Sequence, residues 1–379
     1  MKVITTEKIP VKIWSETIEE GALAQAKNLA NLPFAFKHVA IMPDCHQGYG
    51  MPIGGVLATK GVIIPNAVGV DIGCGMCAVR TSLKEINKET LKRILSEIRQ
   101  TVPVGFEHHR ISQNEKYMPE SKIDRGGVVE REYEKALTQV GTLGGGNHFI
   151  EIQKGDDGYI WIMIHSGSRN IGKQVADYYN RLAFKISQNP NQLSCLDFDS
   201  EEGQKYFKEM NYCVDFALAN RKLMMERTIE IIKKNIPGTK FDPMINIAHN
   251  YASLETHFGQ QVLVHRKGAT LAKKGLIGII PGSQGTESYI VEGLGNIESF
   301  QSCSHGAGRK MSRGEARRTL NLEEEKRRLE AKGILHGIRS RQDLDEASSA
   351  YKPIEEVIKN QEDLVLRKVK LTPLAVIKG

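Results

Sequence analysis

Short apolar runs and longer amphipathic stretches interleave along the whole chain. The runs are rich in Val and Ile and predict strands, because branched side chains suit a pleated surface. We expect these strands at residues 39–42, 61–64, 76–81, 148–153, 160–164, 244–247, 261–265 and 276–280. Apolar positions at helical spacing, with charge on the opposite face, predict helices at 17–31, 84–100, 128–139, 171–187, 203–235, 313–331 and 353–361. The interleaved order predicts a fold of the α/β (α+β) class.

The chain shows no obvious boundary between domains. No Gly/Ser-rich or Pro-rich linker divides it, and it contains no internal repeat or low-complexity tract. The candidate ligands described below span positions 71 to 305 and must converge to act together. We therefore expect residues 1–379 to form one intertwined domain. Two structural domains with a site between them are the alternative.

Composition narrows the class of protein. A chain of 379 residues can bury a large core, and its formal net charge of +7 favours an anionic partner such as nucleic acid or nucleotide. The six cysteines are irregularly spaced, which is typical of reduced thiols and not of a disulfide framework. No run of about 18 apolar residues suggests a membrane span. We expect a soluble, cytoplasmic protein with no membrane partner.

Most of the candidate chemistry lies in five short turn-forming stretches, four of them at the ends of apolar runs. Together they supply one thiol, one carboxylate and four imidazoles, from Asp71, Cys74, His148, His165, His249 and His305. One metal ion usually needs fewer ligands from its protein. The inventory therefore predicts either two ions or one metal centre beside a reactive histidine.

The first of these stretches pairs an acid with a thiol. Asp71 and Cys74 are three residues apart, and glycines flank the thiol, so a sharp turn can present both side chains to one point. Cys74 and Cys77 also form a C-x-x-C pattern, which is compatible with redox chemistry or half of a zinc site. The chain lacks a thioredoxin-like context and a second such pair. We therefore interpret Cys74 as a metal ligand and Cys77 as a core residue.

The other histidines stand where a strand begins or ends. Three glycines precede Asn147 and His148, and the alternation that follows places Ile150 on the same strand face as His148, with Phe149 and Glu151 on the other. The glycines let the backbone approach a ligand closely. His165 and His249 each follow an apolar run, and the Ser-Gly-Ser-Arg sequence after His165 suits phosphate together with metal.

His305 has a different setting. Small residues from 306 to 308 expose backbone amides to a phosphate, and Arg309 and Arg313 can neutralise its charge. An imidazole placed there could attack phosphorus and carry a covalent phosphoramidate. The alternative is an ordinary helix start with a cationic first turn. The loop at 281–288 has a similar composition, and either holds a nucleotide or is only a tight turn.

Several nucleotide motifs are missing. The chain has no G-x-x-x-x-G-K-[ST] loop, and its one approximate dinucleotide fingerprint, at 293–298, lacks the last glycine. The K-x-D-G motif of lysine-dependent nucleotidyl-transferring ligases is also absent. If the protein activates a nucleotide, it does not use a lysine of that kind.

Taken in order, eight segments resemble the signature segments of the RtcB family of RNA ligases. They are residues 43–48, 50–54, 65–75, 144–151, 165–169, 249–251, 281–289 and 304–313. The resemblance extends from about residue 40 to the final Lys378 and Gly379. It implies a single domain with a central β-sandwich-like core surrounded by helices.

The resemblance also implies an activity. The family uses manganese and GTP to join RNA ending in a 2′,3′-cyclic phosphate or 3′-phosphate to RNA with a 5′-hydroxyl. Cys74 would bridge two Mn²⁺ ions, with Asp71 and His148 on one ion and His165 and His249 on the other. His305 would be the catalytic nucleophile that becomes guanylylated. The positions where the family contacts GMP are Asn147, His148, Phe149, Ile150, Glu151, His249, Asn250, Pro281, Gly282, Ser283, Gln284, Ser288, His305, Gly306, Ala307, Gly308 and Lys378.

Some expectations stay open. Arg169, Arg309 and Arg313 are candidates for holding RNA phosphates, which would make binding sensitive to salt. Residues 104–128, including His108 and His109, match no family pattern, so their role and the RNA substrate are undetermined. The sequence also does not say whether an accessory activating protein takes part. The rival interpretations are a binuclear metal-dependent hydrolase or phosphodiesterase, and a non-enzymatic RNA-binding protein.

Overall fold

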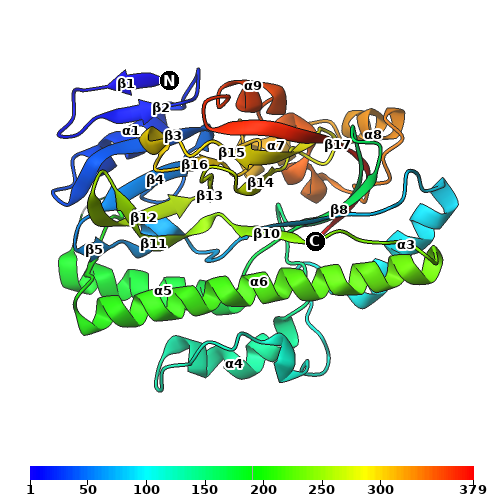
Figure 1. Ribbon diagram of the computed structural model, residues 1–379, viewed down its shortest axis with the longest axis horizontal. Helices are drawn as coiled ribbons and strands as arrows, with labels where there is room; N and C mark the ends of the chain where they lie inside the picture. Colours follow the sequence, from blue (N-terminus) through cyan, green and yellow to red (C-terminus); the bar gives the residue numbers. More distant parts are fainter. Residues whose placement is uncertain (190) are drawn as a thin grey trace.

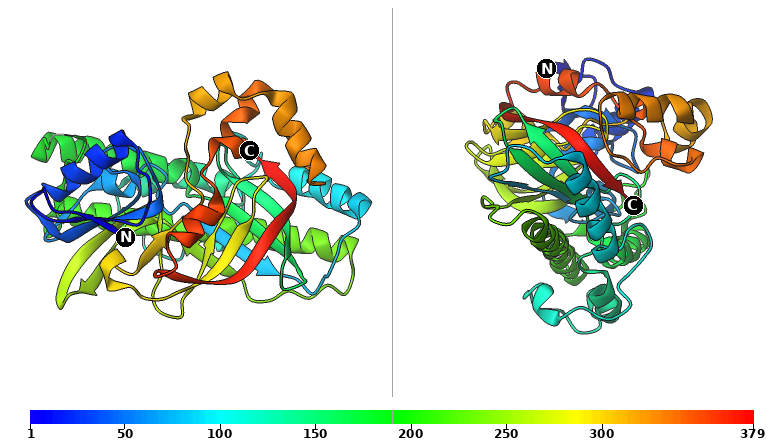
Figure 2. Two further views of the ribbon diagram at one scale, coloured as in Figure 1. Left: turned by 90° about the horizontal axis from the view of Figure 1, so that it is seen from above. Right: turned by 90° about the vertical axis from the view of Figure 1, so that its right-hand side faces the viewer.

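Two β-sheets form the centre of the protein, and helices cover them (Figures 1 and 2). The computed structural model describes residues 1–189 and 191–379. A six-stranded sheet has the order β1 (Lys2–Ile4), β2 (Val11–Ile13), β3 (Ala35–His46), β4 (Ile53–Thr59), β12 (Gln260–Lys267) and β11 (Asn250–His257). Its neighbouring strands are antiparallel except for the parallel pair β2 and β3.

The second sheet carries most of the candidate ligands. Its seven antiparallel strands have the order β10 (Ile245–Ala248), β6 (Gly75–Arg80), β8 (Ile160–Ser166), β7 (Phe149–Gly155), β17 (Val365–Lys378), β15 (Ser288–Gly293) and β14 (Ile277–Ile280). Although β10 and β14 stand at opposite ends of this order, they contact each other. The sheet is therefore curled until it almost closes.

Side-chain alternation gives each face of the curled sheet its own apolar cluster. Ile150 and Ile152 of β7 pack outward with α3 (Lys88–Thr101) and α6 (Glu201–Asn235). Phe149 of the same strand packs on the opposite face with Met163 and Ile290. Period-two alternation predicts this division. The face that holds Phe149 is the one that leads to the site described below.

A third cluster joins the two sheets. Met42 and Val264 of the six-stranded sheet pack with Ile280 and Tyr289 of the seven-stranded sheet. The short strands β13 (Ala269–Leu271) and β16 (Ser302–Ser304) and the helix α9 (Ile354–Lys359) contribute to the same cluster. The mixed α/β class with a sandwich-like centre, expected from the sequence, is confirmed.

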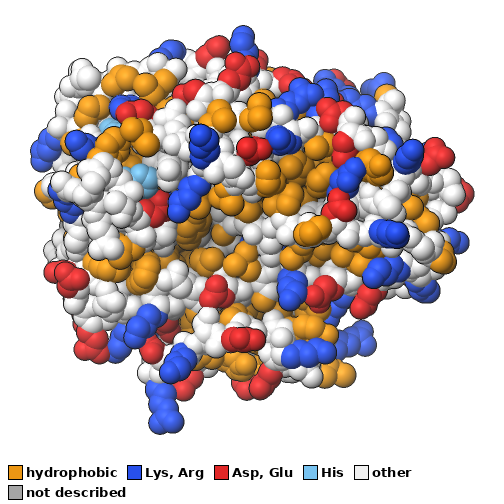
Figure 3. Space-filling view, in the orientation of Figure 1, with side chains coloured by type: hydrophobic (Ala, Val, Ile, Leu, Met, Phe, Trp, Pro, Cys, Tyr) orange, Lys and Arg blue, Asp and Glu red, His pale blue; other side chains and the backbone are white. Residues whose placement is uncertain are grey.

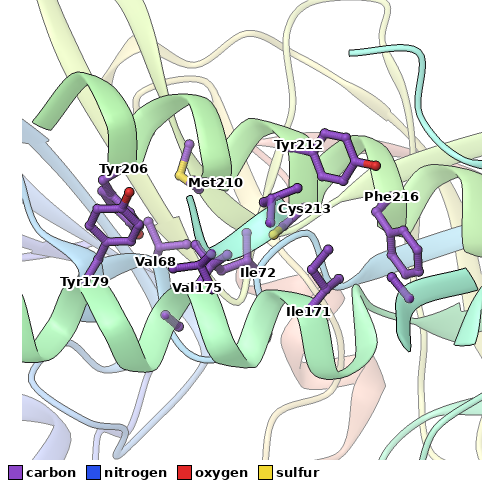
Figure 4. Packing of buried hydrophobic residues seen from close by; sticks show 14 of the residues in the cluster. Val68, Ile72, Ile171, Val175, Tyr179, Tyr206, Met210, Tyr212, Cys213 and Phe216 are labelled. Carbon is purple, nitrogen blue, oxygen red and sulfur yellow. The ribbon is translucent and has the colours of Figure 1, made fainter. Parts of the chain in front are cut away.

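A layer of long helices lies along one side of the sheets (Figure 1). Tyr179 of α5 (Arg169–Ser187) meets Tyr206 of α6, and Ile72 from the loop before β6 lies near Val175 of α5 and Cys213 of α6 (Figure 4). Helix α6 begins at Glu201, and the side chain of the preceding Ser200 caps it by accepting a hydrogen bond from the Gly203 amide. This packing fixes the loop that carries Asp71 and Cys74.

The remaining elements complete the outer layer. They are α1 (Glu20–Ala30), β5 (Val62–Ile63), α2 (Pro65–Val68), η1 (Glu115–Tyr117), α4 (Val128–Gln139), β9 (Leu196–Asp197), η2 (Ile297–Ser299), α7 (Arg313–Thr319), α8 (Leu322–Ala331), η3 (Arg341–Glu346) and η4 (Ser348–Ala350). Within the described ranges, no helix combines the length and apolar character that crossing a membrane requires.

The structure corrects some of the predicted elements. The helix expected at 313–331 is two helices, because the Asn321 side chain accepts the amides of Glu323 and Glu324 and starts α8 afresh. The strands that the sequence did not predict are β1, β2, β4, β9, β11, β13, β15, β16 and β17. Each of the other six predicted helices and all eight predicted strands overlap an observed element. All six cysteines are free, and Cys77 is buried in the core, as expected.

Candidate active site

Four neighbouring strands bring the candidate ligands to one edge of the curled sheet. In the strand order β10, β6, β8 and β7, the end of β10 pairs with the start of β6. The start of β6 pairs with the end of β8, and the end of β8 pairs with the start of β7. His249 follows β10, Cys74 precedes β6, His165 lies near the end of β8, and His148 precedes β7. Because neighbouring antiparallel strands alternate in direction, these four positions fall together.

Three of the side chains at this edge, those of Cys74, His148 and His165, lie close enough to share one ion, and Asp71 and His249 lie beside them. The Cys74 Sγ is 3.4 Å from His148 Nε2 and 3.3 Å from His165 Nε2. The Asp71 Oδ2 is 3.0 Å from the same His148 nitrogen. Ring centroids of His165 and His249 are 5.2 Å apart. The predicted convergence of these five residues is therefore present.

Backbone carbonyls orient two of the imidazoles. Nδ1 of His148 is 3.0 Å from the Leu143 carbonyl oxygen, and Nδ1 of His165 is 3.1 Å from the Asn147 carbonyl oxygen. A carbonyl can only accept, so each Nδ1 carries the proton and each Nε2 keeps a lone pair directed at Cys74. This is the tautomer that a metal ligand requires.

Burial and neighbouring rings keep the imidazoles of His165 and His249 neutral. Burial, followed by the neighbouring rings of His148 and His305, holds the pKa of His165 well below its usual range. Burial and the rings of His305 and His165 do the same to the pKa of His249. Burial raises the pKa of the Cys74 thiol well above its ordinary value, and Asp71 adds to the increase. A bound cation would favour the thiolate that ligation needs.

The chemistry of this donor set fits divalent transition-metal ions. Cys74, His148 and His165 each offer one ligand atom, and these atoms lie within 4.8 Å of one another. Nδ1 of His249 is buried and has no hydrogen-bond partner among the residues that the structure describes, which leaves an unsatisfied donor or acceptor at the same place. A thiol, a carboxylate and neutral imidazoles together suit such ions. The side chains do not by themselves fix which metal or how many ions bind.

His305 lies next in the row of imidazoles. Its ring centroid is 4.8 Å from that of His249. Its Nδ1 is 2.6 Å from Oδ2 of Asp44, a fully buried residue of β3. The same carboxylate oxygen accepts the backbone amides of His305 and Gly306. Burial alone would raise the pKa of the Asp44 carboxyl, but His305, together with His46 and Lys352, outweighs it and holds that pKa below its ordinary value.

This contact fixes the imidazole from behind. A charged carboxylate beside Nδ1 favours a proton on that nitrogen, which leaves Nε2 as the nucleophilic position. Gly308 allows the loop to come this close. It has a φ of +72°, and a side chain there would collide with the backbone of Asp44.

His305 faces a cavity of about 190 Å³. The residues that line it are His46, Ile53, Asn147, Phe149, His165, Pro281, Gly282, Ser283, Gln284, His305, Gly306, Ala307, Gly308, Arg309, Arg313, Glu346, Tyr351 and Lys378. Cations and small residues dominate the wall near His305. This composition suits an anionic ligand.

The carboxyl end of the chain folds back into this cavity, as the sequence analysis expected. Lys378 is 3.6 Å from a carboxylate oxygen of the buried Glu346, and its Nζ lies 5.7 Å from the centre of the Phe149 ring. Glu151 is buried on the same sheet face and one pleat further along β7. Burial raises the pKa of the Glu151 carboxyl to about 8, although the charge of Lys378 opposes the shift.

Six of the residues expected to contact a nucleotide do not line the cavity. The Ile150 side chain lies in the core on the opposite sheet face. The Asn250 side chain donates to the Asp71 carbonyl and accepts the Gly268 amide, so it supports the ligand loop. Ser288 accepts the Gly282 amide and so braces the 281–284 loop. The others are His148 and His249, which belong to the ligand cluster, and Glu151, which lies behind Phe149.

Sequence reasoning missed Asp44, His46, Glu346 and Tyr351. Asp44 and His46 were within reach, because they belong to the 43–48 segment that supported the family resemblance. Glu346 and Tyr351 had no such signal. Glu346 contacts Arg309, Arg313 and Lys378, three cations that are remote from it in sequence.

The arginines expected at RNA phosphates have distinct surroundings. Arg309 and Arg313 line the cavity and pair with Glu346. Arg169 instead donates to the Thr142 hydroxyl and the Gly105 carbonyl, which ties it to the loops around the ligand cluster. In the unassigned 104–128 segment, His108 is exposed and His109 contacts Arg227. Neither of these two histidines lines the cavity.

Comparison with known proteins agrees with the family resemblance seen in the sequence. Residues 25–379 match the model of the family described as tRNA-splicing ligase RtcB. The chain is 40% identical to the RNA-splicing ligase RtcB of Escherichia coli K12 over 412 residues, which covers 100% of this chain and 99% of that protein. It is 35% identical to the tRNA-splicing ligase RtcB of Methanococcus maripaludis, covering 96% of this chain and 92% of that one. It is 31% identical to the RNA-splicing ligase RtcB of Mycobacterium tuberculosis, covering 94% of this chain and 100% of that one.

Proposed function

Because the chain belongs to the RtcB family of RNA ligases, we propose that it is a GTP-dependent ligase that joins RNA ends through a guanylylated His305. Its substrates would be RNA with a 2′,3′-cyclic phosphate or 3′-phosphate and RNA with a 5′-hydroxyl. Such an activity would serve tRNA splicing or RNA repair. The contact between His305 and the buried Asp44, beside the ligand cluster, is the observation that carries this proposal.

The proposed metal site comprises Asp71, Cys74, His148, His165 and His249, and we propose that it holds two Mn²⁺ ions. Bound there, the ions would supply charge neutralisation and Lewis acidity at phosphate oxygens. The protein's own contribution is to fix the ligands. Carbonyl acceptors set the tautomers of His148 and His165, and burial keeps His165 and His249 neutral.

The first proposed step is transfer of GMP to the protein. Nε2 of His305 attacks the α-phosphorus of GTP, the new P–N bond forms, and the bond to the β-phosphate breaks to release pyrophosphate. Asp44 holds the Nδ1 proton throughout and stabilises the positive charge that develops on the ring. Arg309 and Arg313, together with the amides at 306–308, lie where they can balance the phosphate charge.

Two RNA steps then follow. A 3′-phosphate oxygen attacks the α-phosphorus, the P–N bond breaks, and His305 is regenerated as RNA-(3′)pp(5′)G forms. The 5′-hydroxyl of the second strand next attacks the RNA 3′-phosphorus, losing its proton, and GMP leaves. A cyclic phosphate must first be hydrolysed to the 3′-phosphate.

Guanine selectivity has a chemical basis in the same pocket. The guanine edge presents N1–H and N2–H donors beside the O6 acceptor. A carboxylate and an ammonium side by side complement that edge. Lys378 lines the pocket, and the buried Glu151, whose pKa is raised to about 8, would have to lose its proton to accept from the two guanine donors. Adenine presents the reverse arrangement of donor and acceptor at these positions, so the pair would disfavour ATP.

A ligation assay tests the function. Two RNA oligonucleotides, one with a 3′-phosphate and one with a 5′-hydroxyl, are incubated with the protein, Mn²⁺ and either GTP or ATP. We expect joined RNA with GTP only, and no product when the first strand ends in a 3′-hydroxyl. RNA cleavage or phosphate release without GTP would instead support a binuclear metal-dependent phosphodiesterase or hydrolase.

A further inference from the structure

A second cavity, of about 670 Å³, adjoins the pocket of His305. The two share Gln284, Glu346 and Lys378 in their walls. The other walls of the second cavity come from the end of α3, the unassigned segment that follows it, and the residues just before η3. In both views of Figure 2, the carboxyl end of β17 lies close to α3, which brings these segments together.

The two cavities are connected along the loop that carries a metal ligand. Gly145 and Gly146 line the second cavity, the next residue Asn147 lines the pocket of His305, and His148 then joins the ligand cluster. A chain lying along these glycines would therefore reach the ligand cluster at its end.

Two of the cations that line the second cavity have no ion-pair partner among the described residues. Within the ranges that the structure describes, the side chains of Arg99 and Arg339 have no carboxylate oxygen within 4.0 Å. The acidic side chains of the lining contact other groups. Asp343 accepts the backbone amides of Arg339 and Ser340, Asp345 pairs with Arg313 and Arg317, and Glu346 pairs with Arg309, Arg313 and Lys378. Burial and the charge of Arg339 both lower the pKa of Arg99, so the two guanidinium groups repel each other. An anion between them would relieve that repulsion.

An unprotected aromatic ring completes the cavity. Phe106 is 97% exposed, although burial of such a ring is normally favourable. Unpaired nucleic-acid bases stack on exposed aromatic side chains next to cationic grooves, independently of sequence. Arginines without an ion-pair partner beside an exposed phenyl ring are features that suit a single-stranded RNA site.

We propose that this second cavity binds the RNA strand that carries the 3′-phosphate, with a backbone phosphate at Arg99 and Arg339 and a base on Phe106. The inference rests on the proposed ligase function. In that reaction, the 5′-hydroxyl attacks in line, opposite the departing GMP. The second cavity shares Lys378 with the proposed guanine site, so it lies on the GMP side. A separate groove of about 910 Å³, which adjoins the pocket at His46, Ile53, Arg309 and Arg313, is left for the 5′-hydroxyl strand.

The test separates the two strands kinetically. The full-length protein, with Mn²⁺ and GTP, is compared with the double variant Arg99→Gln/Arg339→Gln. The strand concentration that gives the half-maximal ligation rate is measured for each strand in turn, with the other saturating. We expect the half-maximal concentration of the 3′-phosphate strand to rise about 10-fold in the variant. The half-maximal concentration of the 5′-hydroxyl strand should be unchanged. Formation of the protein–GMP adduct, which needs no RNA, should also be unchanged.

Varying the length of the 3′-phosphate strand tests whether that strand contacts the two arginines. With a 3′-phosphate strand of a single nucleotide, the variant and the unchanged protein should perform alike, because such a substrate cannot reach the arginines. Arg110→Gln is the matched control, since Arg110 is exposed in the same segment but does not line the cavity. The proposal is wrong if the double variant needs the same half-maximal concentration of each strand as the unchanged protein. It is also wrong if only the concentration of the 5′-hydroxyl strand rises.

A second pair of variants protects the test from a folding defect. Phe106→Ala should weaken binding of the 3′-phosphate strand about 5-fold or more, and Phe106→Trp should restore it, because stacking needs only an aromatic face. Both changes are at an exposed position and leave the core intact. Absence of the adduct in the unchanged protein would contradict the proposed ligase. A normal adduct with an unaffected 3′-phosphate strand in these variants would contradict only this inference.

Discussion

At the scale of single residues, the site depends on which nitrogen of each histidine is held. Backbone carbonyls hold Nδ1 of His148 and His165, whereas a buried carboxylate holds Nδ1 of His305. The first arrangement suits metal ligation, and the second suits a nucleophile because it can stabilise positive charge on the ring. The different partners thus divide similar side chains into two roles.

Asp44→Asn tests the role of the carboxylate behind His305. An amide keeps the shape but not the charge, so we expect the rate of protein–GMP formation to fall on the order of 100-fold. GTP affinity should change little, because Asp44 lies behind the ring and outside the cavity lining. Single-turnover labelling at several GTP concentrations separates the two effects. Asp199→Asn, at an exposed position, is the control. A loss of affinity at an unchanged maximal rate would contradict the assigned role.

Cys74 and Cys77 provide a matched comparison within one C-x-x-C pattern. We expect Cys74→Ala to weaken Mn²⁺ binding by about 100-fold or more, since loss of a ligand should cost at least as much as loss of a supporting contact. Cys77→Ala should leave metal binding intact and lower stability by about 1 kcal/mol, because Cys77 packs in the core. Titration calorimetry and chemical denaturation measure the two quantities. Similar metal affinity in both variants would exclude Cys74 as a ligand.

At the scale of secondary structure elements, the sequence predicted helices better than strands. Helical periodicity identified α4 to the residue, but β17 was missed entirely. This strand mixes Lys and Arg with apolar residues and contains Pro373, which lies where the pairing with β7 shifts register. A proline at a bulge is compatible with a central strand, yet it hides that strand from pattern analysis. The strand that brings Lys378 to the site was therefore not predicted, although Lys378 itself was expected there.

Strand β7 makes a testable prediction about pH. Burial raises the pKa of Glu151 from 4.5 to about 8 in the folded protein, so the folded state binds a proton that the unfolded state releases. The stability that this group contributes is present below pH 4.5 and is lost as the pH rises toward 8. Glu151→Gln removes that loss. Relative to the unchanged protein, the variant should gain at least about 1.4 kcal/mol between pH 5 and pH 8, the equivalent of one pKa unit.

Urea denaturation at a series of pH values, without metal or nucleotide, measures this difference. Glu292→Gln, a partly exposed position of β15 in the same sheet, is the control and should show no comparable trend. A constant stability difference across this pH range would mean that Glu151 is not protonated in the folded protein.

At the scale of the whole molecule, the site is assembled from segments that are far apart in sequence. Residues between 44 and 378 meet around one cavity. The sequence could indicate which turns carry reactive side chains, because glycine and histidine cluster there. It could not indicate that Glu346 would gather three cations, because that depends on tertiary packing alone. Nor does net charge locate the site: on the face in Figure 3, Lys and Arg side chains are interspersed with Asp and Glu.

The most direct test of the account is to locate the covalent nucleotide. The full-length protein is incubated with Mn²⁺ and GTP labelled at the α-phosphate, and the labelled peptide is identified by mass spectrometry. We predict one GMP on His305, lost in acid but stable in alkali as a phosphoramidate should be, and absent from His305→Ala. A label on any other residue, or an unlabelled protein that still joins RNA ends, would contradict the account.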